Sequence, residues 1–149
     1  DTGVTTTEVT YETNHEEIDA GTLTDLVSWK DIEAIGDSVS GVGTYTTTFT
    51  LPDDFDPETQ SVEFEADSFN YGTAMITVND QNVSVDMDTA KADITDAVKA
   101  GENTISVRVT SSLCNVVRGF EPVFWITDET EPADYGMTGK TVLTVTTTK

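Results

Sequence analysis

The chain has 149 residues, of which 28 are acidic and only 7 basic, so its formal net charge at pH 7 is −21. A surface this negative repels nucleic acids and anionic membranes, and no stretch approaches the roughly 18 consecutive apolar residues of a membrane-spanning helix. We therefore expect no nucleic acid partner and no membrane insertion. The length predicts a single domain over residues 1–149 with a sizeable core. Abundant threonine and aspartate with few lysines suggest a secreted or cell-surface bacterial protein.

The composition also bears on catalysis. Cys114 is the single cysteine, so no internal disulfide can form, and a thiol inside an apolar run is usually a small buried hydrophobe. His15 is the single histidine and lies in an acidic segment without any motif. A nucleophilic cysteine or serine needs a nearby base. The sequence therefore gives no indication of an enzyme.

In chain order, short segments with alternating apolar and polar residues are separated by turn residues, which predicts β-strands. The first of these segments, residues 2–11, is either an edge strand or part of a linker that covers residues 1–12. The predicted strands lie in residues 2–11, 42–51, 61–69, 73–80, 83–85, 105–110, 123–126 and 141–148. Asn79-Asp80 predicts a hairpin turn between two of them. About eight antiparallel strands with one short helix indicate an all-β jelly-roll sandwich.

The short helix is expected at the start of residues 93–109, a segment that joins one helical turn to a strand. Ile94, Ala97 and Val98 are spaced i, i+3 and i+4, and either Asp93 or Thr95 can cap the turn. Gly101 provides a residue that tolerates positive φ where the turn stops. Residues 105–109 then alternate apolar and polar side chains, as a half-buried strand does.

The order of these segments resembles the galactose-binding-like jelly-roll domain found as the sugar-binding domain of glycoside hydrolase family 2. The resemblance covers residues 40–145 and rests on four motifs in sequence order. These motifs are GVGTYTTTFTLP, SVEFEADSFNYGTAMITVNDQNV, ITDAVKAGENTISVRVTSSLCN and YGMTGKTVLTV. Two departures are Asn79-Asp80, where family members often have Asn-Gly, and Val117, where related domains often carry a basic residue.

This resemblance implies a function without catalysis. In such hydrolases the jelly roll is ordinarily an accessory module attached to a separate catalytic domain. The expected function is thus a carbohydrate-binding or accessory module of a secreted multimodular bacterial glycoside hydrolase, whose partners are a glycan and the neighbouring catalytic domain. The alternative is a structural β-sandwich module of a cell-surface adhesin. A stand-alone hydrolase is disfavoured, because no pair of carboxylates can be singled out among 28 acids.

Sugar sites combine an exposed aromatic ring with planar amides or carboxylates. Tyr71 is the best aromatic candidate, and the adjacent Asn70 and Asp67 complete a polar corner. The competing interpretation of Tyr71 is a turn aromatic that closes the core. Trp29 and Trp125 are large enough for a sugar platform, but their apolar neighbours favour core packing.

Asn115 and Arg118 are the remaining candidate ligand-binding residues. Arg118 can bind a carboxylated sugar through a bidentate pair, or it can neutralise nearby acids as a structural bridge. Asn115 can bind ligand or satisfy loop backbone. No cofactor is required. A structural calcium ion is compatible with the acidic loops, although no D-x-D-x-D-G motif assigns its ligands.

Overall fold

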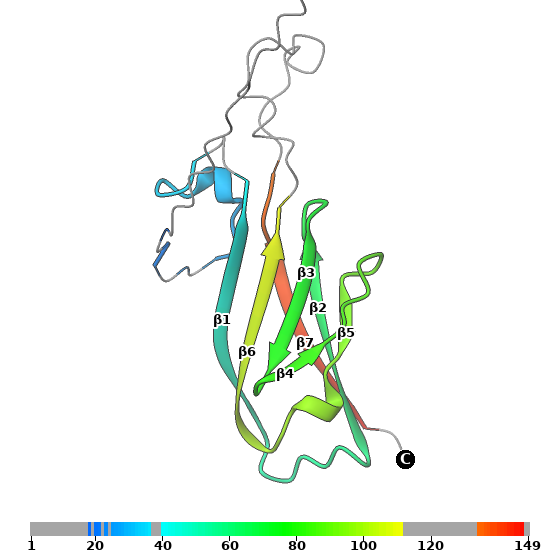
Figure 1. Cartoon of the computed structure of the whole chain (residues 1–149). Coiled ribbons are helices and arrows are strands. Elements are labelled where there is room, and N and C mark those ends of the chain that lie inside the picture. The colour runs from blue at the N-terminus through cyan, green and yellow to red at the C-terminus, as the bar shows by residue number, and fades with distance from the viewer. Residues whose placement is uncertain are drawn as a thin grey trace, which may run out of the picture.

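The computed structural model describes residues 18, 20, 21, 23, 25–36, 40–111 and 134–147. These residues contain seven strands in two antiparallel sheets, and no helix among them is long and apolar enough to cross a membrane. The first sheet has the order β1 (Val42–Leu51), β6 (Gly101–Thr110), β3 (Thr73–Val78), β4 (Gln81–Val83). The second has the order β5 (Lys91–Asp93), β2 (Gln60–Ser68), β7 (Thr138–Thr147). The predicted all-β sandwich is confirmed (Figure 1).

The core lies between the two sheets and follows the predicted alternation. Along β2, Val62, Phe64 and Ala66 are buried, while the acidic residues between them face outward. In the other sheet, β6 buries the apolar residues of its alternating segment, and Ile76 of β3 lies beside Val107 of β6 in the register. Removing this apolar surface from water is the main force that holds the sheets together. The predicted strands at residues 2–11 and 123–126 lie outside the described residues.

The expected short helix is a single 3₁₀ turn, η2 (Thr95–Ala97), between β5 and β6. The residue at the N-cap of this turn is Ile94, so the prediction that Asp93 or Thr95 caps it is wrong. Asp93 lies one residue earlier, and its Oδ1 accepts a hydrogen bond from the Thr95 amide at 3.0 Å. Together with a bond from the Thr95 hydroxyl, this bond lowers the pKa of Asp93. Gly101 has φ +83°, which confirms the predicted positive-φ stop.

The predicted hairpin between β3 and β4 is present, and its turn is tied to the core. Asn79 and Asp80 both have positive φ, at +47° and +68°. The Asn79 Oδ1 accepts the Thr104 amide at 3.1 Å, and its Nδ2 donates to the Ala97 carbonyl at 2.9 Å and to Asn103 Oδ1 at 2.7 Å. Asn103 is itself only 1% exposed. The turn therefore holds β4, η2 and β6 together.

A second connection links the segment before β1 to the start of β7. Ser28 exchanges two hydrogen bonds with the Tyr135 backbone, and the Gly139 amide donates to the Leu26 carbonyl at 3.2 Å. Trp29, in the 3₁₀ turn η1 (Trp29–Asp31), lies edge-on to the Tyr135 ring at 5.4 Å between centroids and is buried. The predicted core position of Trp29 is confirmed. We refer to these contacts between residues 26–29 and 135–139 as the clasp.

A partly buried phenol, that of Tyr45, lies beside the clasp. The indole Nε1 of Trp29 donates a hydrogen bond to the Tyr45 hydroxyl, and the Met137 amide donates to the same oxygen at 3.1 Å. Burial raises the pKa of Tyr45, although its hydrogen bonds with Met137 and Trp29 oppose this shift. The neutral phenol thus joins β1 to the segment that enters β7.

Candidate functional site

The site begins at the corner where the chain passes from β2 in one sheet to β3 in the other. The Gly72 amide donates to the Phe69 carbonyl at 2.9 Å, which closes a four-residue turn. Its central residues, Asn70 and Tyr71, have φ +50° and +62°. A Cβ on Gly72 would lie 2.5 Å from the Thr110 carbonyl oxygen, so only glycine fits where the turn passes β6. These four residues form the corner turn.

Asn70 holds the corner turn against the start of β7. Its Nδ2 donates to the Gly136 carbonyl at 2.8 Å and to the Thr138 hydroxyl at 3.0 Å, while its Oδ1 accepts from Ser68 Oγ at 3.2 Å. Both amide hydrogens are therefore engaged within the protein. Asn70 positions the turn, and its amide has one acceptor lone pair left for a ligand.

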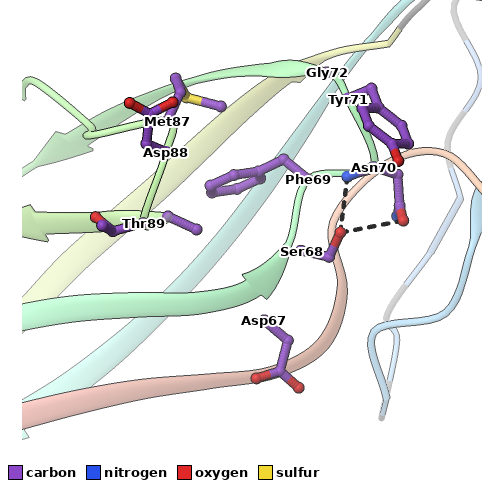
Figure 2. A pocket seen from close by; sticks show the side chains of 10 residues that line it. Asp67, Ser68, Phe69, Asn70, Tyr71, Gly72, Met87, Asp88 and Thr89 are labelled. Atoms are coloured by element: carbon purple, nitrogen blue, oxygen red, sulfur yellow. Dashed lines mark hydrogen bonds between the residues drawn. The ribbon is translucent and has the colours of Figure 1, made fainter.

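Tyr71 is 100% exposed, so the alternative in which this ring closes the core is wrong. Figure 2 shows its ring projecting from the corner turn on the side of Asn70, away from Met87 and Asp88. Its backbone lies in the left-handed region, where bulky residues are rare. The sequence thus places an aromatic ring in solvent at a position that disfavours one.

A pocket of about 410 Å³ lies between the corner turn and the connection from β4 to β5. Phe69 is buried and points toward that connection, as Figure 2 shows. The residues that line the pocket are Asp67, Ser68, Phe69, Asn70, Tyr71, Gly72, Met87, Asp88, Thr89 and Ala90. We call this the corner pocket.

The connection between β4 and β5 keeps its shape through its own hydrogen bonds. Asp86 exchanges two backbone hydrogen bonds with Lys91, and its Oδ1 accepts the Asp88 amide at 2.9 Å. The Ala66 amide of β2 donates to the Ala90 carbonyl at 3.0 Å and attaches the connection to the sheet. Met87, which is 39% exposed, and Asp88 are thereby presented beside the corner turn.

Asp67 lines the pocket, but one of its carboxylate oxygens is already hydrogen-bonded within the protein. Its Oδ2 accepts the Lys140 amide at 2.7 Å, and its side chain lies against Gly139. Figure 2 shows the carboxylate directed toward β7, away from Tyr71 and Met87. Asp67 is thus a wall of the pocket, and Asp88 presents the more accessible carboxylate.

Lys91 of the second sheet, which directly follows the pocket residues 87–90 in the sequence, is already paired. Lys91 Nζ lies 3.2 Å from Glu63 and 3.6 Å from Glu65, on the outer face of β2 and β5. Its hydrogen bond to Glu63 and the charges of both carboxylates raise the pKa of Lys91. Its charge is therefore directed at the outer face.

The structure brings together three of the five predicted ligand-binding residues, Tyr71, Asn70 and Asp67. Asn115 and Arg118 lie outside the described residues, as does Trp125, so those predictions remain open. The sequence analysis missed Phe69, Met87 and Thr89, since no local pattern shows which distant loop meets the corner. In the described part of the chain, no group of three or more His, Cys, Asp or Glu side chains could hold a metal ion, and calcium remains a prediction.

Comparison with solved structures finds a similar fold in parts of two glycosidases. The rhamnosidase of Novosphingobium sp. PP1Y matches with a TM-score of 0.66 and 21% identity, over 83% of this chain and 12% of the rhamnosidase. A glycosyl hydrolase family 2 member from Bacteroides cellulosilyticus matches with a TM-score of 0.51 and 21% identity, over 91% of this chain and 16% of that protein. The resemblance predicted from the motifs is confirmed for the fold.

The chain thus spans a small part of each of these large proteins. No protein-family model matches the sequence, and no curated protein does. The function therefore has to be argued from the site.

Proposed function

We propose that the chain is a non-catalytic carbohydrate-binding module of a secreted bacterial multimodular glycoside hydrolase, and that the corner pocket holds the glycan. Its fold matches only 12% and 16% of two large glycosidase chains, which supports an accessory role beside a separate catalytic domain. The observation that supports this proposal most strongly concerns Tyr71. Its ring is fully exposed, and its backbone adopts a conformation that favours glycine.

The backbone of Tyr71 has an energetic cost that packing does not repay. A left-handed conformation costs a residue with a side chain about 1 kcal/mol, and glycine or asparagine would reduce that cost. A buried aromatic recovers such a cost through the apolar surface it removes from water. The ring of Tyr71 removes none in the free protein. A partner that covers the ring supplies the missing contact, and strained exposed residues of this kind cluster at ligand sites.

The neighbouring groups suit a sugar. The apolar face of a pyranose stacks on an aromatic ring, and its hydroxyls donate to carboxylates or exchange hydrogen bonds with hydroxyls. Tyr71 offers a ring on one side of the corner turn, and Asp88 offers an acceptor and Thr89 a hydroxyl on the connection beside the other side, so a glycan has to extend over the turn to contact both. Met87, which is partly exposed, adds apolar surface. We expect shallow contacts and modest affinity, which suit a module that keeps an enzyme near its substrate.

A glycan array followed by calorimetry tests the proposal. Wild type should bind at least one glycan, Tyr71→Ala should bind it about tenfold more weakly, and Tyr71→Phe should retain most of the affinity. Met75→Ala is the matched control, because Met75 is an exposed side chain on β3 that does not line the pocket. Equal binding by wild type and Tyr71→Ala would overturn the assignment of the site. The absence of binding across the array would overturn the carbohydrate function.

Two further measurements address the rest of the proposal. Calorimetry in the presence of a chelator tests the structural calcium ion, whose removal should lower the thermal midpoint if it is bound. Incubation with chromogenic glycosides tests the absence of catalysis. Turnover that follows the purified chain would contradict the accessory role.

A further inference from the structure

We infer that the corner pocket accepts glycans that carry no acidic groups and discriminates against uronic acids and other anionic sugars. This inference rests on the proposed function and names the ligand class of the same site. Three independent features of charge lead to it.

The first feature is the distribution of basic residues along the chain. No lysine or arginine occurs between Lys30 and Lys91. Both segments that form the pocket, residues 67–72 and 87–90, lie within this interval. Neither segment can therefore supply the bidentate guanidinium or the ammonium group that usually binds a sugar carboxylate.

The second feature is the paired state of Lys91, which adjoins the pocket in the sequence. Lys91 follows the pocket segment directly, but its ammonium group binds Glu63 and Glu65 on the outer face of the second sheet. At the other wall, Lys140 contacts Asp67 through its backbone amide. In the part of the chain that the structure describes, no basic side chain lines the pocket.

The third feature is the carboxylates themselves. Asp88 is exposed and lines the pocket, and Asp67 forms another wall. Asp86 adds a third negative charge two residues from Asp88. A sugar hydroxyl can donate to such oxygens, whereas a sugar carboxylate can only accept and is repelled. The net charge of −21 adds a repulsive field that lowers the encounter rate of any anionic glycan.

Matched sugar pairs test this selectivity. The probes are hexasaccharides of β-1,4-glucan and glucuronan, β-1,4-mannan and mannuronan, and 1,4-linked galactan and galacturonan, together with the methyl ester of the galacturonan. For any pair whose neutral member binds, we expect the acidic member to bind at least about tenfold more weakly in low salt. The methyl ester should recover much of the affinity that the free acid lacks, because esterification removes the charge and leaves the sugar ring and its hydroxyls unchanged. The difference should shrink between about 0.02 M and about 0.5 M salt, since ions screen exposed charges.

Two variants assign the discrimination to the pocket. Asp88→Asn should reduce the ratio of neutral to acidic affinity severalfold. Asp53→Asn removes the same charge from the loop between β1 and β2, at the opposite end of the sandwich (Figure 1), and should leave the ratio unchanged. Acidic members that bind as tightly as their neutral partners, or Asp88→Asn and Asp53→Asn with equal ratios, would overturn the inference while the carbohydrate function stands. If no neutral or acidic probe binds and the array is also silent, the proposed function itself fails.

Discussion

In the described part of the chain, two turns have consecutive residues with positive φ, and these turns differ in what their side chains do. In the hairpin turn, Asn79 makes three hydrogen bonds to η2 and β6, and one of its partners is the buried Asn103. In the corner turn, Asn70 likewise makes three hydrogen bonds, but the second residue is Tyr71, fully exposed. The first turn is explained by the fold alone. The fold does not account for the aromatic residue of the second turn, which we propose contacts a glycan.

This difference separates positions that specify the structure from positions that are available for function. An asparagine side chain tolerates the left-handed region and can hydrogen-bond nearby backbone, so it is a natural choice for a turn that must be held in place. A tyrosine has neither property. Where the backbone disfavours a residue and packing does not reward it, selection for binding is the simplest physical account.

The largest expected effect is at the hairpin turn. Asn79→Ala removes three hydrogen bonds and leaves Asn103 with one partner fewer. It also places alanine at positive φ, where its side chain cannot form the hydrogen bonds by which asparagine offsets the strain. We expect a loss of about 3 kcal/mol in the free energy of unfolding, measured by urea denaturation. Asn82→Ala, at an exposed position of β4, is the control and should cost much less. A loss below about 1 kcal/mol would show that the hairpin turn does not organise η2 and β6.

The next effect has the opposite sign. Tyr71→Gly relieves the left-handed strain, partly offset by the greater freedom of glycine in the unfolded chain, so the free energy of unfolding should rise by about 0.5 kcal/mol. Glycan binding should be lost at the same time. A stability gain with loss of binding is the signature of a residue kept for function. Destabilisation by Tyr71→Gly would instead show that the ring supports the fold.

The smallest effect is a pH dependence confined to the hairpin side of the molecule. The pKa of Asp93 lies below its ordinary value of 3.8 in the folded protein, because Thr95 donates two hydrogen bonds to its carboxylate. Its contribution to stability is therefore present above pH 3.8 and is lost as the pH falls through the lower folded value. Thr95 also contacts β2 through the Val62 amide, so its displacement should loosen η2.

Hydrogen exchange of the Thr95 and Ala97 amides checks this prediction. Protection should fall in acid for the wild type, and Asp93→Asn should show the reduced protection already at neutral pH. The Gly72 amide of the corner turn is the internal reference and should follow only global unfolding. Parallel loss of protection at Thr95 and Gly72 would contradict the local assignment.

Local pattern predicted the fold because its determinants are local. The alternation of Val62, Phe64 and Ala66 places one face of β2 in the core, and a period of two needs no tertiary information. The positive φ of Gly101 and of Asn79 could be predicted, because glycine and asparagine both tolerate positive φ. Burial of Trp29 was likewise expected from its apolar neighbours.

The site was only half predictable, because a pocket depends on which loops meet. Tyr71 could be selected from its polar neighbours, but nothing near Met87 indicates that its loop packs beside the corner turn. The hydrogen bonds from Asn70 to Gly136 and Thr138 could not be predicted from the sequence either, since these residues lie more than sixty positions away. Hydrogen-bond donors therefore have to be counted in the structure before they are assigned to a ligand.

The clasp has a mechanical consequence when the protein is pulled from both of its sides. Tension applied before Leu26 and after Thr147 passes from the Leu26–Gly139 hydrogen bond directly into β7. The Leu26–Gly139 hydrogen bond takes this force first and should yield before the Ser28–Tyr135 hydrogen bonds and the Trp29–Tyr135 contact behind it. The corner turn adjoins this load path, because Asn70 binds Gly136 and Thr138 at the start of β7. Tension on β7 should therefore reach the corner turn, whereas the hairpin turn at Asn79 has its hydrogen bonds to η2 and β6.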